Sequence, residues 1–189
     1  MNKTKKAIFQ SAIEIFSKAG YNGATMDDIA INAGVAKGTL YYHFKSKEEI
    51  FNYIITNGLE MMRVAVEDAV KAEENTVLKI RTMCKFQLEL IYENKDFFKV
   101  IMSQVWGQEL RQVELRKCIE EYLKTIERFL QEGMDNGVLK KSDSNFMAYT
   151  FFGTLFSAAI YELINAENTD IEMLIDNLMN FIFKGIEMY

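Results

Sequence analysis

The chain has 189 residues, 49% of them apolar, and contains no proline. A chain of this length can bury a full hydrophobic core, and the lack of proline favours long helices over a turn-rich β protein, so we expect an all-α fold. The formal net charge of −5 argues against a nucleic-acid partner for the chain as a whole.

The charge is divided unevenly along the chain. Residues 1–50 contain seven lysines and five acidic residues, a net charge of +2, whereas the remaining residues carry a net charge of −7. This asymmetry suits a small N-terminal DNA-binding module carried by an acidic body. Because +2 is modest, specific contacts must supplement the electrostatic attraction to DNA.

The first elements in chain order predict a compact module of three helices. An amphipathic helix is expected over residues 3–19, and residues 25–44 then predict two short helices joined by a tight turn. Thr25 and Asp28 have the spacing of a capping box, and Gly34 falls where a helix ends in the left-handed conformation that favours glycine. The second short helix is expected at residues 37–43, after Ala36, which lacks the hydroxyl of a usual N-cap. These features indicate a helix-turn-helix, whose second helix lies in the DNA major groove.

The residues that follow carry a more specific signal. Residues 38–44 read GTLYYHF and residues 46–49 read SKEE. Together with the helix-turn-helix, they resemble the signature of the TetR family of bacterial one-component transcriptional regulators. The resemblance implies a helix-turn-helix domain at residues 1–46 and a helical domain for ligand binding and dimerisation at residues 47–189.

Two groups of DNA contacts are implied by the resemblance, one to the phosphate backbone and one to the base edges. Lys37 can donate to guanine, and Gly38, which has no side chain, allows close approach of the backbone. Any one of these residues can instead be an ordinary surface or partly buried residue. The implied contacts are Thr25, Tyr41 and Lys47 to the backbone, and Lys37, Gly38, Thr39, Tyr42 and His43 in the groove.

Periodicity predicts further helices at about residues 46–71, 76–93, 96–106, 109–135, 143–165 and 170–187, about nine in all. An N-terminal three-helix module and a C-terminal helical bundle are therefore expected. His43 is the only histidine, and we find no cluster of metal ligands, activated nucleophile or glycine-rich phosphate loop. We expect no catalysis, metal or cofactor. Cys84 and Cys118 have no partner motif, and the N-terminus lacks a secretory cleavage site, so a cytoplasmic protein with reduced thiols is expected.

Residues 146–161 contain no charged side chain, but they are too short to span a membrane. Such a helix must be buried by protein, and with the apolar stripe of the last helix it can form a four-helix dimer interface. The alternative is that both helices belong to the core of a monomer. The residues predicted at the dimer interface are Gly153, Ser157, Ile160, Leu174, Leu178 and Ile182.

The middle of the chain is rich in aromatic and methionine side chains, which can line an adaptable apolar pocket. They can equally fill a solid core, and the family resemblance is what favours a pocket for a small apolar or amphipathic effector. The predicted lining residues are Met83, Phe86, Gln87, Leu90, Phe98, Met102, Trp106, Phe129, Tyr149 and Phe152.

These features predict a homodimeric repressor that binds a palindromic double-stranded DNA operator. Effector binding would move the helix at residues 47–71 and change the spacing of the two recognition helices. The alternative from another class is a helical adaptor of the same fold that acts through contacts with other proteins. Selection of bound sequences from random DNA separates the two, because only the repressor predicts a palindrome.

Overall fold

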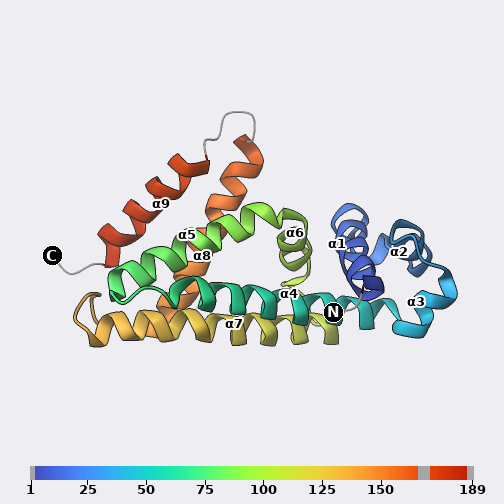
Figure 1. The fold of residues 1–189 in the computed structure, drawn as a ribbon, viewed down its shortest axis with the longest axis horizontal. Helices are drawn as coiled ribbons and strands as arrows, with labels where there is room; N and C mark the ends of the chain where they lie inside the picture. The colour runs from blue at the N-terminus through green and yellow to red at the C-terminus, as the bar shows by residue number, and fades with distance from the viewer. Residues whose placement is uncertain (1–2, 166–170, 187–189) are drawn as a thin grey trace. The chain divides into compact units, whose positions relative to one another are not determined.

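The computed structural model describes residues 3–165 and 171–186, and within these ranges the chain forms nine α-helices and no strand (Figure 1). The all-α prediction is confirmed, including an N-terminal helix-turn-helix followed by longer helices. The helices are α1 (Lys3–Gly23), α2 (Met26–Asn32), α3 (Lys37–His43), α4 (Lys47–Val70), α5 (Thr76–Glu93), α6 (Lys95–Gln104), α7 (Leu110–Asp135), α8 (Ser144–Asn165) and α9 (Ile171–Ile186).

Local signals define the helix-turn-helix as predicted. The Thr25 hydroxyl accepts a hydrogen bond from the Asp28 N–H at 3.1 Å, and the Asp28 carboxylate accepts one from the Thr25 N–H at 3.2 Å. This capping box begins α2. Gly34 has φ 65°, which turns the chain toward α3, and Ala36 begins α3 without a side-chain hydrogen bond.

The end of α1 differs from its predicted end. Gly20, with φ 69° and ψ 168°, interrupts the helical geometry at the expected place, but helical residues resume beyond it as far as Gly23. This short extension carries Tyr21, whose ring lies 5.6 Å from that of Phe16 and 5.4 Å from that of Phe51. The extra turn therefore adds an aromatic contact between α1 and α4.

The chain forms two compact units. The first contains the residues up to Met61 together with Asn94–Ile119, and the second contains Met62–Glu93 and the residues from Glu120 onward. Helices α4 and α7 each contribute residues to both units. The functional division expected between residues 46 and 47 stays a prediction, since these units describe packing.

Each unit has its own apolar core. In the first, α1 packs against α2 and α6, and α2 packs against α3. In the second, α5 packs against α8 and α9. No helix within the described ranges has the length and apolarity required to cross a membrane. The large side chains with less than 2% exposure include Ile8, Ile29, Leu40, Phe51 and Ile54 in the first unit and Ile80 and Met83 in the second.

Candidate DNA-binding interface and effector site

Helix α3 presents one face to solvent and buries the other. Leu40 is completely buried, whereas Tyr42 is 77% exposed. The structure places all the residues predicted to enter the groove on this helix, and only His43 among them is partly buried. Its ring meets that of Tyr42 edge to face, with the centroids 5.1 Å apart. The predicted groove contacts therefore occupy one short exposed helix, and their role in DNA contact stays a prediction.

Lys37, at the start of α3, is held by α2. Its ammonium forms an ion pair with Asp27 at 2.8 Å and lies 6.0 Å from the centroid of the Tyr41 ring. The hydrogen bond to Asp27 and its negative charge raise the pKa of Lys37, so this amine remains a cation at neutral pH. To bind a guanine, Lys37 must exchange the exposed Asp27 carboxylate for the base.

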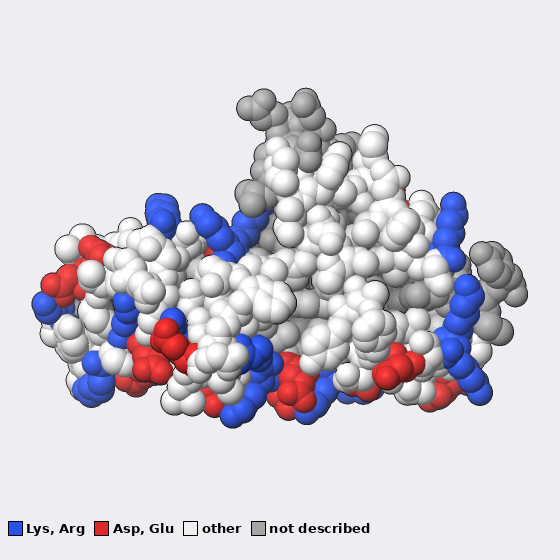
Figure 2. Space-filling view, turned by 180° about the vertical axis from the view of Figure 1, so that it is seen from behind, with Lys and Arg blue, Asp and Glu red and all other residues white. Residues whose placement is uncertain are grey.

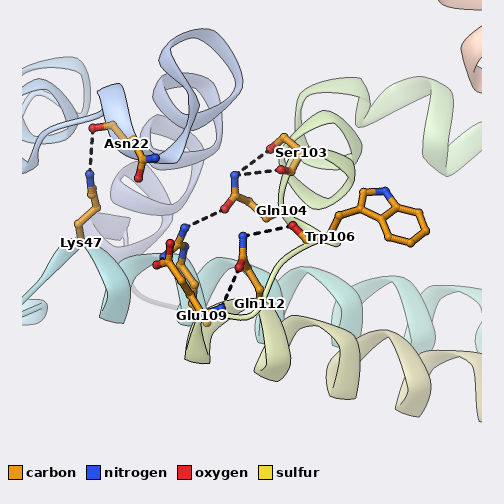
Figure 3. A network of polar contacts seen from close by, with 8 residues as sticks. Asn22, Lys47, Ser103, Gln104, Trp106, Glu109 and Gln112 are labelled. Carbon is orange, nitrogen blue, oxygen red and sulfur yellow. Dashed lines mark hydrogen bonds and ion pairs between the residues drawn. The ribbon is translucent and has the colours of Figure 1, made fainter.

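Two of the residues predicted to bind phosphate already have partners within the protein. The Thr25 hydroxyl is part of the α2 cap. The Lys47 ammonium donates to the carbonyl oxygen of Asn22 at 3.4 Å (Figure 3). It also donates to the Ala24 carbonyl oxygen at 2.9 Å and lies 4.6 Å from the centroid of the Tyr21 ring. Lys47 thus joins the first turn of α4 to the end of α1 and to Ala24, which follows it.

A polar network that the sequence did not predict fixes the α6–α7 turn against α1. The Arg111 side chain is only 7% exposed, and its guanidinium lies 3.9 Å from the centroid of the Tyr21 ring. Arg111 also pairs with Glu109 and donates to the Gln104 amide oxygen at 3.2 Å (Figure 3). Gln112 closes the turn, since its amide oxygen accepts from the Glu109 N–H at 3.0 Å. Tyr21 and Arg111 are far apart in sequence, and neither belongs to a motif that could have paired them.

Charges on the surface are mixed. Figure 2 shows lysine and arginine side chains interspersed with acidic ones, and no large field of one sign on the face in view. This agrees with the modest +2 of the first fifty residues. Within the described ranges, no group of three or more His, Cys, Asp or Glu side chains is arranged to hold a metal ion.

The residues predicted to line an effector pocket are divided by the structure. Trp106 and Tyr149 are 83% and 47% exposed, so the structure does not place them in a buried interior. Phe98 and Met102, like Trp106, belong to the first compact unit, whereas the other predicted lining residues belong to the second. The members in the interior of the second unit are Met83, Gln87 and Phe129, which are buried, and Phe86, Leu90 and Phe152, which are partly buried.

Among the described residues of the second unit, two side chains have buried polar atoms without a hydrogen-bond partner. Neither amide atom of Gln87 has a hydrogen bond within the described part of the chain, and the same holds for the Tyr122 hydroxyl. Burial raises the pKa of Tyr122, so its hydroxyl keeps its proton and can donate. Tyr122 was missed by the sequence reasoning, because a tyrosine at an apolar position of a helix is ordinarily a core residue.

The surface of α8 and α9 retains large apolar side chains. Ile160, one of the residues predicted at a dimer interface, is 50% exposed, and Gly153 and Ser157 are also exposed. Leu174 and Leu178 are partly buried, but Ile182 is only 8% exposed and is already packed within the protomer. The exposed apolar residues that the prediction omitted include Phe146, Tyr161, Ile164, Met173 and Phe181.

The chain is similar in sequence and in fold to known bacterial regulators. Residues 8–54 match the family model of bacterial regulatory proteins of the tetR family. A solved structure from Clostridium perfringens, described as a fatty acid metabolism regulator, is 45% identical, covers 97% of this chain and 100% of that chain, and has a TM-score of 0.89. The fatty acid metabolism regulator protein of Bacillus subtilis (strain 168) is 27% identical over 186 residues, which are 95% of this chain and 93% of that protein.

A more distant structure shows the same fold. The transcriptional regulator FadR from Bacillus subtilis, crystallised in complex with stearoyl-CoA, is 21% identical, covers 96% of this chain and 99% of that chain, and has a TM-score of 0.85. The capped α2, the glycine turn and the exposed α3 thus occur in a chain that resembles solved regulators along nearly its whole length. The chain belongs to the TetR family and is a DNA-binding transcriptional regulator.

Proposed function

We propose that the protein is a homodimeric repressor that binds a palindromic operator through α3 and leaves it when the second unit takes up a long-chain acyl-CoA. The observation that carries the DNA-binding part is the α3 face with Lys37, Gly38, Thr39 and Tyr42 open to solvent. Such a face can enter the major groove while the first turn of α4 lies near the phosphate backbone. As a DNA-binding regulator, the protein acts in the cytoplasm and has no catalytic role.

The DNA contacts divide according to the geometry. Lys37 and Tyr42 are the candidates for base contacts, because both side chains project from the exposed face of α3. Tyr41 is the candidate for a phosphate contact from that helix. Lys47 contributes mainly by positioning, since its ammonium is bound to the carbonyl oxygens of Asn22 and Ala24. Phosphate contact at this place then comes from the backbone N–H groups at the start of α4.

Dimerisation is supported by the apolar surface of α8 and α9. Exposed contiguous apolar side chains are uncommon on a monomer and usually mark an interface. The exposed side chains of Ile160, Ile164 and Phe181 are suited to a four-helix contact between two protomers. A two-fold symmetric dimer places its two α3 helices in successive major grooves, roughly 34 Å apart, if it binds one face of DNA.

The effector class is supported by the relatives. The Clostridium perfringens relative is described as a regulator of fatty acid metabolism, and the FadR structure holds stearoyl-CoA. The second unit of the present chain offers methionine and aromatic side chains to an acyl chain. Because α4 and α7 each run through both compact units, a change in the second unit can reach the first through continuous helix. Release requires that the effector bind the DNA-free state more tightly than the DNA-bound state.

Selection of bound duplexes from random DNA tests the proposal. We expect a palindrome whose affinity falls steeply with salt concentration, and weaker binding after addition of stearoyl-CoA. Tyr42→Ala should weaken the selected site by roughly tenfold or more if it contacts a base. Tyr92→Ala, which alters an exposed tyrosine of α5, should leave affinity unchanged.

The outcomes separate the parts of the proposal. A palindrome without any response to stearoyl-CoA retains the DNA-binding role and removes this effector class. The selection is repeated at a low and a high salt concentration. If no motif is enriched at either, the repressor hypothesis is overturned, and an adaptor that acts through protein contacts is supported.

A further inference from the structure

We propose that the interior of the second unit binds a neutral hydrogen-bonding group of its ligand through the Gln87 amide and the Tyr122 hydroxyl. The ligand class is an apolar chain that carries an uncharged carbonyl, as in an acyl thioester, ester or amide. This assignment rests on the proposed function, because it names the chemistry that the effector site recognises.

Gln87 supplies the first observation. It lies on α5 and is 1% exposed, yet neither its amide oxygen nor its amide nitrogen has a hydrogen-bond partner in the described part of the chain. A buried amide without partners carries a free-energy penalty that folded proteins almost always avoid. A partner supplied by another molecule removes this penalty.

Tyr122 supplies the second observation, from a different helix. It lies on α7, is 3% exposed, and its hydroxyl has no hydrogen-bond partner in the described part of the chain. Its ring packs edge to face on Phe152 of α8, with the centroids 5.9 Å apart. A phenylalanine would make the same ring contact without burying a hydroxyl, so packing alone does not account for a tyrosine here.

Both groups lie on helices of the second unit, Gln87 on α5 and Tyr122 on α7. Lys79 of α5 pairs with Glu132 of α7 at 2.9 Å, and a Cβ built on Gly133 would lie 2.9 Å from the Ile80 side chain. The chain directions of α5 and α7 are opposite (Figure 1). Residues after Ile80 on α5 and residues before Gly133 on α7 therefore lie on the same side of this contact. Gln87 lies about two turns beyond Ile80, and Tyr122 about three turns before Gly133. Counted along each helix from this contact, their levels differ by about one turn. Helix α8, whose Phe152 contacts the Tyr122 ring, also packs against α5.

The surroundings favour a neutral ligand group over a charged one. Within the described residues of the second unit, no Lys, Arg, Asp or Glu side chain is fully buried. A free carboxylate placed beside Gln87 would therefore lack a buried counter-charge, which makes its transfer from water very unfavourable. A carbonyl oxygen needs only hydrogen-bond donors, and the Tyr122 hydroxyl and the Gln87 amide nitrogen are both donors.

The first test measures the ligand-free protein, with the absence of bound lipid verified by mass spectrometry. Tyr122→Phe and Gln87→Met remove the polar atoms and keep most of the volume, so each should raise the melting temperature by ~2–4 °C. Ser11→Ala is the matched control, because the Ser11 hydroxyl is buried but donates to the Ile29 carbonyl oxygen at 2.8 Å. That variant should lower the melting temperature. A lower melting temperature for Tyr122→Phe would show that the hydroxyl has a partner within the protein and would overturn the assignment.

The second test uses two ligands that differ only in the carbonyl group. Dodecanoyl-CoA is a thioester, and S-dodecyl-CoA is the thioether with the same chain and the same nucleotide. Wild-type protein should bind the thioester roughly tenfold more tightly. The Tyr122→Phe, Gln87→Met double variant should bind the two equally. Equal affinities for the wild type would mean that the buried groups are satisfied by water only, against the assignment.

A third pair separates this inference from the proposed acyl-CoA effector. If the wild type binds neither CoA compound, that effector class fails, and N-methyldecanamide and decanoate are compared at neutral pH. Binding of the neutral amide in preference to the anion, lost in the double variant, supports the carbonyl site without the nucleotide. Binding of neither, or of both equally, overturns it.

Discussion

The two compact units treat their buried polar groups differently. In the first, the Ser11 hydroxyl donates to the Ile29 carbonyl oxygen at 2.8 Å, and the Ser17 hydroxyl donates to Asp96 at 2.6 Å. In the second, Gln87 and Tyr122 are buried with polar atoms that have no partner among the described residues. The first unit thus pairs its buried hydroxyls internally, and its one buried polar atom without a hydrogen-bond partner among the described residues is the Arg111 Nε, whose guanidinium lies against the Tyr21 ring. In the second unit the unpartnered groups are an amide and a hydroxyl, which are the groups that the proposal assigns to a ligand carbonyl.

In the first unit, α1 is held by contacts with α6 and with the start of α7. Ser17 joins the C-terminal part of α1 to α6 through its hydrogen bond to Asp96, while Arg111 lies over the Tyr21 ring at the end of α1. Both partners belong to segments that follow α5 in the chain, yet they pack with the helix-turn-helix. The three helices α1 to α3 are therefore supported by α6 and the start of α7, which belong to the same compact unit.

The strongest test of this support is Arg111→Met, which keeps an unbranched side chain but removes the guanidinium. We expect a loss of about 2–3 kcal/mol in the free energy of unfolding, because a desolvated cation–π contact and hydrogen bonds to a charged group are lost together. Urea denaturation followed by circular dichroism measures the change. Arg128→Met is the control, since Arg128 is 61% exposed and its ion pair with Glu67 should contribute at most about 1 kcal/mol. Equal losses for the two variants would mean that the Arg111 network contributes nothing special to the first unit.

Two glycines of the first unit should respond to alanine with opposite signs. A Cβ on Gly58 would lie 2.3 Å from the ring of the buried Phe97, so Gly58→Ala should cost about 1–3 kcal/mol through overpacking. A Cβ on Gly38 meets nothing within 4 Å, so Gly38→Ala should stabilise α3 by up to about 1 kcal/mol.

Operator affinity gives a second test of Gly38, with Gly58 as the comparison. Gly38→Ala should weaken operator binding even though it stabilises the fold, because its methyl group would occupy the space through which the α3 backbone approaches the groove. Operator titration with both variants at one temperature and salt concentration checks this. Unchanged affinity for Gly38→Ala would remove Gly38 from the predicted DNA contacts.

The helix start at Ala36 offers a smaller gain. Ala36 has the extended backbone of an N-cap, with φ −64° and ψ 144°, but no side chain that can accept a hydrogen bond. Ala36→Ser should therefore raise the free energy of unfolding by about 1 kcal/mol, as the reverse of a lost N-cap. Thr25→Ala at the neighbouring α2 should lower it by a similar amount. A neutral effect of Ala36→Ser would show that the start of α3 is already satisfied in another way.

Local chemistry explains which parts of this structure were predictable from the sequence. The Thr25–Asp28 cap, the turn at Gly34 and the exposed side of α3 each depend on residues a few positions apart, so the local pattern contains the information. The Tyr21–Arg111 contact and the unpartnered Tyr122 depend on how distant helices pack. Periodicity identifies the buried face of a helix, but it does not say whether a hydroxyl on that face finds a partner. For the same reason it did not show that Trp106 is exposed or that Ile182 is buried within one protomer.

The two units also differ in the exposure and expected reactivity of their cysteines. The ionisation of these thiols should have almost no effect on stability at neutral pH. Cys84 is completely buried in the second unit, one turn from Gln87, and burial raises its pKa to about 12. Cys118 is partly exposed in the first unit, with its sulfur 3.9 Å from the Thr56 hydroxyl oxygen. Since the thiolate is the reactive form, a thiol reagent at pH 8 should label Cys118 and leave Cys84 unmodified until denaturant is added.

The raised pKa also fixes the sign of a pH effect. The folded state keeps Cys84 protonated, so its contribution to stability is complete below the unfolded pKa of about 8.5 and is lost as pH rises toward 12. The free energy of unfolding should decline over that range, and Cys84→Ala should reduce the slope. Labelling of Cys84 at pH 8 as fast as Cys118 would show that the interior around Gln87 opens readily to water. In that case the unpartnered amide would be hydrated for much of the time, and the two units would differ in mobility more than in the pairing of their buried polar groups.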